Sequence, residues 1–323
     1  MKRLVEFDIA KALCIVLVVM GHYSAAEPVW WVDVHNIIYT FHMPLFLFAS
    51  GYIYIAFKKE ESYGHFLLKK LKRLVIPYIV TSVIIIAIKL LTQSVLYVKN
   101  PVSAISFLKI FYYPEAAYHL WFIWTLWWIF CLVPLIKTRI LRTILFVAAA
   151  VLHYVHPYLD LPEVFCIDTT ARMLVWFMLG VMCFDWKLNV DKVRLYYVVA
   201  ALMLFVAALV FREKLVLAML LCPYLGIVFV MLLSKWISGR KVPKALLVVS
   251  ASSYMIYLFH STFMGFAQAI MMKIPLLNTL PITTLVIAIA TGVIVPVLLQ
   301  YLLQRSKVSR FMFGLSKPAV RLG

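Results

Sequence analysis

The sequence is poor in charge, and above all in acidic residues. Only 14% of its 323 residues are Asp, Glu, Lys or Arg, and 13 residues are acidic. About a quarter of the residues in soluble domains are charged, so this composition excludes an ordinary water-soluble fold. Hydrophobic residues make up 65% of the chain instead, and long apolar runs recur throughout it. We therefore predict an all-α, polytopic membrane protein that forms one integral-membrane domain over residues 1–323.

Cysteine is scarce as well, and the motifs of several enzyme classes are missing. None of the five cysteines belongs to a C-x-x-C pair, so we expect small buried thiols and not a metal site or a disulfide framework. The sequence has no H-E-x-x-H zinc motif, no G-x-S-x-G nucleophile elbow and no Walker or G-x-G-x-x-G loop. We therefore expect no metal cofactor.

Ten apolar segments are long enough, or nearly long enough, to cross a bilayer. They cover residues 5–26, 37–57, 74–92, 118–136, 142–156, 170–186, 195–211, 215–234, 246–272 and 282–303. The 31 Lys and Arg residues gather in alternate connections, most densely in residues 58–73. Because positive charge marks cytoplasmic loops, both termini are predicted to be cytoplasmic. The net charge of +18 is thus explained by topology and by contact with anionic membrane lipid, with no need for nucleic acid.

The first apolar segment carries ionisable residues, which are costly in a membrane and are functional candidates by default. Its start resembles a signal peptide, but Asp8 and Lys11 interrupt the apolar run, so we expect a retained helix. Lys11 and His22 are eleven residues apart, which places them on one helix face about 16 Å from each other. Asp8 is spaced to pair with Lys11. The alternatives are a Lys11 that reaches the inner interface and a His22 that is only a polar residue at the outer boundary.

Three further histidines lie in the predicted helices. His42 is expected at the same depth as the histidine of the first segment, and both are expected to face one cavity; Pro44 beside it suits a helix that lines such a cavity. His119 is expected at the outer mouth of the fourth segment, where the ring of Trp121 could stack on a sugar. His260 is expected near mid-membrane. The alternatives are helix packing for His42 and His260, and an interfacial aromatic belt for the fourth segment.

A basic run precedes the third apolar segment. It reads Lys69-Lys70-Leu71-Lys72-Arg73. Lys70 and Arg73 are three residues apart, so in an α-helix they share a face and together suit a phosphate group. The alternative is that the run only marks the cytoplasmic end of the helix.

In this order, the motifs resemble the acyltransferase-3 family of integral-membrane acyltransferases. The similarity rests on Lys11 with His22, on Phe41-His-Met-Pro-Leu-Phe46 with Ser50-Gly51-Tyr52, on the basic run into Ile76-Pro77-Tyr78, on His119-Leu-Trp-Phe122, and on Tyr254-Met-Ile-Tyr-Leu-Phe-His260. These pieces span residues 1–262. The compact length and the Phe-His-Met-Pro motif are most similar to the fucose-4-O-acetylase-like branch of sugar O-acetyltransferases.

The resemblance implies transfer of an acyl group, usually acetyl from acetyl-CoA, to a hydroxyl of a cell-surface glycan or its lipid-linked precursor. Lys11 and His22 match the family's basic residue and histidine, and His22 is expected to act as general base. Lys70 and Arg73 match an R-x-x-R pattern, with a lysine point charge where the family has a bidentate arginine. Acceptor binding is expected at His42, His119, Trp121 and His260.

Two other functions fit the same residues. A secondary transporter or channel for a polar solute would use Lys11, His22 and His260 as a relay or gate. The lack of visible repeats and the few intramembrane acids weigh against it. A non-catalytic receptor or scaffold would not depend on His22. For the acyltransferase, the expected location is the plasma membrane of a bacterium.

Overall fold

The structure, a computed structural model, describes residues 4–23, 28–96, 98, 100–188, 192–278 and 280–317. These residues form helices joined by connections, and no strand occurs among them. The predicted all-α class is therefore confirmed. The prediction of cytoplasmic termini concerns residues 1–3 and 318–323, which lie outside these ranges. The five cysteines are free thiols, three of them buried and two half-buried.

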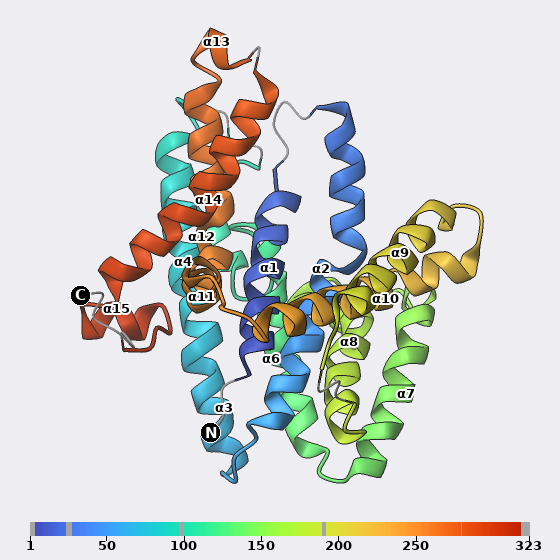
Figure 1. Cartoon of the computed structure of the whole chain (residues 1–323). Coiled ribbons are helices and arrows are strands. Elements are labelled where there is room, and N and C mark those ends of the chain that lie inside the picture. Colours follow the sequence, from blue (N-terminus) through green and yellow to red (C-terminus); the bar gives the residue numbers. More distant parts are fainter. Residues whose placement is uncertain are drawn as a thin grey trace.

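Each of the ten predicted apolar segments coincides with a helix (Figure 1). These helices are α1 (Val5–Gly21), α2 (Val29–Ala56), α4 (Ile76–Thr92), α6 (Trp121–Leu132), α7 (Arg139–Val155), α8 (Ile167–Asp185), α9 (Leu195–Phe211), α10 (Val216–Ser238), α12 (Ser253–Met271) and α14 (Pro281–Leu303). Within the described ranges, seven helical stretches are long and apolar enough to span a membrane. An eighth qualifies if α11 (Lys244–Ala251) and α12, which meet at an angle of 80°, count as one span.

Five of the ten helices have 17 residues or fewer, but α4, α6 and α7 are lengthened by adjoining helical turns, whereas α1 and α9 are not. Helices α1 and α9 have 17 residues each. A helix of that length measures about 26 Å, less than a hydrocarbon core of about 30 Å. The ten helices are thus present, whereas the number that cross the membrane stays a prediction.

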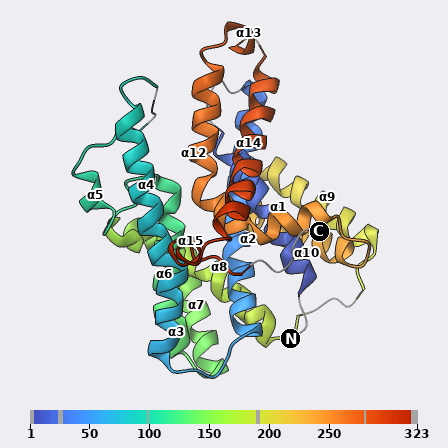
Figure 2. The same cartoon turned by 90° about the vertical axis from the view of Figure 1, so that its left-hand side faces the viewer.

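Helix α1 occupies the centre of the bundle. It contacts α2, α10, α11, α12 and α14, and Figures 1 and 2 show it surrounded by these helices from both directions. Ile9, Ala12 and Ile15 are completely buried. A helix that is apolar on most of its sides is stable in such a central place. As a result, the C-terminal end of α1 lies among other helices and does not face lipid.

Helices α2 and α8 touch through their backbones. The small pair Ser50-Gly51 favours such close contact. A Cβ atom at Gly51 would lie 1.9 Å from the carbonyl oxygen of Phe177, and one at Gly180 would lie 2.0 Å from that of Phe48. Each glycine therefore meets the other helix's backbone, and no larger residue fits there unless the helices move apart.

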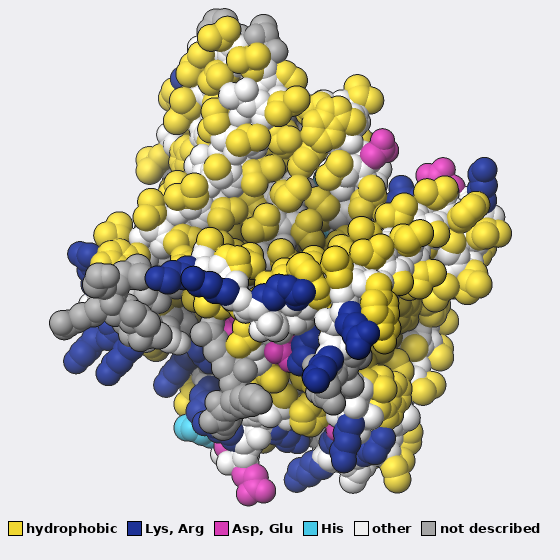
Figure 3. Space-filling model, in the orientation of Figure 1, with side chains coloured by type: hydrophobic (Ala, Val, Ile, Leu, Met, Phe, Trp, Pro, Cys, Tyr) yellow, Lys and Arg dark blue, Asp and Glu magenta, His cyan; other side chains and the backbone are white. Residues whose placement is uncertain are grey.

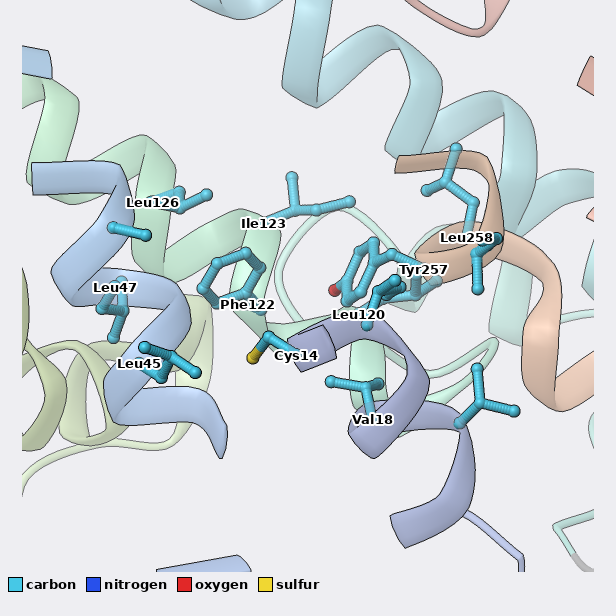
Figure 4. Close-up of a cluster of buried hydrophobic side chains, with 14 of the residues drawn as sticks. Cys14, Val18, Leu45, Leu47, Leu120, Phe122, Ile123, Leu126, Tyr257 and Leu258 are labelled. Atoms are coloured by element: carbon cyan, nitrogen blue, oxygen red, sulfur yellow. The ribbon is translucent and has the colours of Figure 1, made fainter. Parts of the chain in front are cut away.

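Side chains from distant parts of the sequence meet in one buried core (Figure 4). It includes Cys14, Val18, Leu45, Leu47, Leu120, Phe122, Ile123, Leu126, Tyr257 and Leu258. These residues belong to α1, α2, α6, α12 and the short turn η2 (Tyr118–Leu120) that leads into α6. Their packing fixes how α1, α12 and the start of α6 lie relative to one another, and each of these carries a candidate histidine.

The third apolar segment continues a helical stretch that starts at Tyr63 and includes the basic run of residues 69–73. Helix α3 (Tyr63–Lys70), the π-helix η1 (Leu71–Val75) and α4 follow one another without a break. Lys69, in the last turn of α3, donates a hydrogen bond to Glu61 just before that helix, which holds the pKa of the Glu61 carboxyl below its ordinary value. In η1 the backbone hydrogen bonds reach one residue further than in an α-helix. Residues three apart across η1 therefore need not share a face.

Basic side chains gather on one part of the surface (Figure 3). In that view most of them lie level with and below α11 and α15 (Lys307–Met312), whereas the surface over α12 and α14 is mainly hydrophobic. A basic end and an apolar flank are typical of a protein whose basic end faces the cytoplasm. The orientation itself stays a prediction.

Candidate active site

Three histidines from separate helical segments form one cluster. His22 caps the C-terminal end of α1, His119 lies in the short 3-10 turn η2 (Tyr118–Leu120), and His260 lies in α12. Their ring centroids are 5.0 Å apart for His22 and His260, 5.6 Å for His22 and His119, and 4.6 Å for His119 and His260. We refer to these three residues as the histidine cluster. In the described part of the chain, no three His, Cys, Asp or Glu side chains are placed to hold a metal ion.

Hydrogen bonds to the backbone orient His260. Its Nδ1 lies 2.9 Å from the carbonyl oxygens of both Ile256 and Tyr257. Carbonyl oxygens only accept, so Nδ1 carries the proton, and Nε2 of the neutral ring holds the lone pair. Among the described residues, Nε2 of His260 and Nε2 of His119 are buried without a hydrogen-bond partner. Such atoms are rare in folded proteins, and their presence in one cluster favours a functional site.

The histidine cluster borders a cavity of about 400 Å³. The cavity lies between α4 and α12, which separate from each other toward the top of Figure 2. His22 and His119 line it, together with Tyr39 of α2, Ile85 of α4 and Met264 of α12. Small-molecule sites have volumes of about 300–1,000 Å³ and mostly apolar walls with a few polar groups. The cavity therefore has the size and lining of a substrate site.

His42 lies behind Tyr39 and not on the cavity wall that the structure describes. Its Nδ1 donates a hydrogen bond of 2.8 Å to the carbonyl oxygen of Ile38. Its ring lies 4.8 Å from the ring of Tyr39, which in turn lies 6.3 Å from that of His22. The ring of Tyr39 therefore lies between the rings of His42 and His22 and connects the two histidines.

Trp121 begins α6, half-buried, and its ring meets that of Phe122 edge-on at 6.0 Å. It is not among the described residues that line the cavity. Tyr118, which precedes it in η2, does line the cavity and is 57% exposed. Within the run that begins with Tyr118, the ring at the cavity wall is therefore that of Tyr118 and not that of Trp121. No sequence pattern within this aromatic-rich run indicates which ring faces the cavity.

Lys11 lies far from the histidine cluster, on the same helix as His22. Eleven residues separate the two, which is about 16 Å along the axis. The Lys11 ammonium lies 2.9 Å from the Asp8 carboxylate, so the predicted pairing is confirmed. Ser250 of α11 donates a further hydrogen bond of 3.4 Å to the same carboxylate oxygen. Lys11 thus belongs to an ion pair near the beginning of α1.

Lys70 and Arg73 contact different partners in the structure, although α-helical spacing predicted that the two share a face. The Lys70 ammonium lies 3.7 Å from the centre of the Phe130 ring, which is a cation–π contact. Arg73 instead donates a hydrogen bond of 3.4 Å to the hydroxyl of Ser316, near the C-terminal end of the described chain. The intervening residues belong to the π-helix η1, which changes the spacing on which the prediction relied.

Arg73 has two other cationic neighbours. It lines a cavity of about 180 Å³ together with Lys72 and with Arg310 of α15. We refer to Lys72, Arg73 and Arg310 as the inner basic pocket. Gly314, at a φ of +61°, packs closely on Arg73, since a Cβ atom added there would lie 3.0 Å from the Arg73 carbonyl oxygen. Arg310 was not among the expected site residues, because no local sequence pattern connects a basic residue after the last apolar segment with one before the third.

Comparisons with known proteins identify the family. The family model described as "Acyltransferase domain" matches residues 4–301. Nodulation protein NolL of Mesorhizobium japonicum is 27% identical over 142 residues, which cover 42% of this chain and 36% of that protein. Nodulation protein NolL of Sinorhizobium fredii is 40% identical over 57 residues, which cover 16% of each chain. The matched regions thus span well under half of either relative. No solved structure matches the chain. The chain belongs to the acyltransferase-3 family of membrane acyltransferases.

Proposed function

We propose that the protein is an O-acyltransferase that moves an acyl group, in the first instance acetyl, from cytoplasmic acyl-CoA to a hydroxyl of a cell-surface glycan or lipid-linked sugar. Membership of the family supports acyl transfer. The observation that carries the assignment to a site is the histidine cluster on the wall of a cavity of substrate size. The proposed location is a bacterial plasma membrane, with both termini in the cytoplasm.

In this proposal His22 is the general base. The acceptor oxygen attacks the carbonyl carbon of the thioester while His22 removes the hydroxyl proton. A C–O bond forms and gives a tetrahedral oxyanion, which collapses as the C–S bond breaks. His22 then returns the proton to the CoA thiolate, so that the ester and free CoA leave and the imidazole is neutral again.

The other two histidines assist this step. Nε2 of His260 holds a lone pair and has no partner among the described residues, so in the reacting complex it can accept a hydrogen bond from the neighbouring His22 ring or from the acceptor. Ser261 lies 3.3 Å from Nδ1 of His119. With the Ser261 hydroxyl donating to Nδ1, Nε2 of His119 carries a proton and can stabilise the oxyanion. His42 orients the acceptor through Tyr39, and a contribution of Trp121 to acceptor binding stays a prediction.

The acyl-CoA donor approaches from the basic, inner side in this proposal. Its phosphates bind near Arg73, with Lys70 and Lys11 as further positive charges along the route. Phosphate binding by arginine is favoured by its fork of donors. The pantetheine arm then enters the bundle and brings the thioester to the histidine cluster, where the acceptor hydroxyl arrives from the outer side.

The test uses the purified protein in lipid nanodiscs with radiolabelled acetyl-CoA and a panel of glycans. Release of CoA is measured for the wild type, for His22→Ala and for His65→Ala. His65 lies on α3 with 58% of its side chain exposed, so its variant is a matched control. We expect release to depend on His22 and not on His65. Undiminished release by folded His22→Ala would contradict the proposed base, and solute uptake without any CoA release would favour the transporter.

A further inference from the structure

The cavity beside the histidine cluster has one cationic wall residue. Lys89 lines it from α4, and the described lining residues include no other Lys or Arg and no Asp or Glu. The half-buried Lys89 ammonium donates a hydrogen bond of 3.1 Å to the carbonyl oxygen of Asn100. Glu115, an acid of the connection after α4, forms its ion pair with Lys109, at 3.2 Å, and attracts Lys89 only from a longer distance. In the described ranges, no carboxylate forms an ion pair with Lys89.

A second polar group of the cavity wall, in the side chain of Gln268, also lacks a hydrogen-bond partner among the described residues. The side-chain nitrogen Nε2 of Gln268 is buried and makes no hydrogen bond to any described residue. Gln268 lines the cavity from α12, seven residues and thus about 10 Å beyond Ser261, which contacts His119. On α4, Lys89 follows Ile85 by one turn in the same direction. The polar groups and the histidine cluster therefore lie at different levels of one cavity.

A partly desolvated ammonium without a carboxylate partner is costly unless an anion binds to it. Nothing acidic on the described wall supplies that anion. We infer that the acceptor is an anionic sugar, whose carboxylate or phosphate group binds Lys89 and Gln268 while one of its hydroxyls reaches His22. The inference rests on the proposed function and specifies its substrate class. Apolar neighbours such as Ile88 strengthen the attraction because they lower the local dielectric.

Binding is tested separately from catalysis. Nanodisc-embedded full-length protein is titrated calorimetrically, without donor, with glucuronic acid, glucose 1-phosphate and glucose. We expect a charged sugar to bind about tenfold or more tightly than glucose, as a hydrogen bond to a charged group allows. Lys89→Gln should lose this preference and Lys89→Arg should keep it. Lys273→Gln removes an exposed lysine outside the described cavity wall, and it should behave like the wild type.

The outcomes separate the inference from the proposed function. If the wild type binds the three sugars equally well, the inference is overturned, and this result requires no variant. The inference is also overturned if Lys89→Gln still prefers the charged sugars. Lys89-dependent binding of a charged sugar without any CoA release supports the inference and contradicts the proposed function. CoA release that depends on His22 but occurs only with neutral acceptors supports the proposed function and contradicts the inference. The two charged sugars tell whether the anion is a carboxylate or a phosphate.

Discussion

The hydroxyl of Tyr257 donates a hydrogen bond of 2.7 Å to the backbone carbonyl oxygen of His119. The same tyrosine ring lies edge-on to the His119 ring at 5.7 Å, and its own carbonyl oxygen accepts the Nδ1 proton of His260. One buried residue thus positions two members of the histidine cluster. It does so by joining α12 to the turn that precedes α6.

The substitution Tyr257→Phe should therefore reduce acyl transfer while it preserves the shape of the core. It removes the hydrogen bond that the Tyr257 hydroxyl donates to His119, and loss of such a bond costs about 0.5–1.5 kcal/mol. We expect kcat to fall about tenfold, as a small misplacement of reacting groups allows, with little change in the KM for acetyl-CoA. Steady-state kinetics over a range of pH on folded protein measures both effects.

The matched control for this tyrosine is Tyr63→Phe. The hydroxyl of Tyr63 also donates 2.7 Å to a backbone carbonyl oxygen, that of Cys131, but at the inner end of the molecule. It should leave kcat unchanged. If both variants lower the melting temperature and neither lowers the kcat of the folded protein, Tyr257 has only a structural role.

Local spacing accounts for what the sequence could predict of the site. Within α1, three residues separate Asp8 from Lys11, and this spacing predicted their ion pair correctly. The meeting of His119 and His260 depends on how α12 packs against the start of α6. No periodicity within one helix reports such a contact between helices, so the sequence named the residues of the cluster without predicting that they touch.

The segment from Lys70 to Arg73 shows where a prediction from local residue spacing fails. The spacing of Lys70 and Arg73 was interpreted with α-helical geometry, but the residues between them form a π-helix. Their side chains consequently reach Phe130 and Ser316, respectively. A π-helix has no clear sequence pattern, and the approach of the C-terminal segment is a tertiary contact. The partners of Arg73 could therefore not be predicted from the sequence.

The close contact of α2 and α8 predicts a severe effect of Gly51→Ala. The added methyl group would lie 1.9 Å from a backbone oxygen of α8, so the helices must separate. Overpacking of a core commonly costs about 1–3 kcal/mol, and a clash with backbone should reach at least the upper end. We expect a clear fall in the melting temperature of the purified protein. Gly64→Ala is the control, because nothing lies within 4 Å of its added methyl group; an equal fall there would contradict the explanation.

A buried ion pair between α7 and α8 gives a second stability prediction. Arg142 donates two hydrogen bonds to the Asp185 carboxylate, at 2.7 and 2.9 Å, and the two side chains are 12% and 9% exposed. Removal of one partner leaves a buried charge alone, which costs about 3–5 kcal/mol. Asp185→Leu should therefore destabilise the protein strongly, as measured by thermal unfolding. The double variant Arg142→Leu with Asp185→Leu should recover most of the loss; no recovery would mean that the pair itself is not the cause.

The inner basic pocket predicts that Arg310 affects the donor and not the chemistry. In the proposed function this pocket attracts the phosphates of acyl-CoA. Loss of one hydrogen-bonded cation should raise the KM for acetyl-CoA about tenfold in Arg310→Gln and leave kcat unchanged. The effect should shrink as salt is added, because exposed charges are screened. Lys70→Gln should have a smaller effect, since the Lys70 ammonium lies on the ring of Phe130.

The control for Arg310 is another cation of the same helix. Lys307 of α15 is exposed and does not belong to the described lining of the inner basic pocket. In Lys307→Gln the total charge changes by the same amount as in Arg310→Gln, but the pocket keeps its three cations. Equal increases of KM in both variants would mean that the basic surface attracts the donor only through its net charge. An increase confined to Arg310→Gln would mean that the C-terminal segment contributes a specific contact to donor binding.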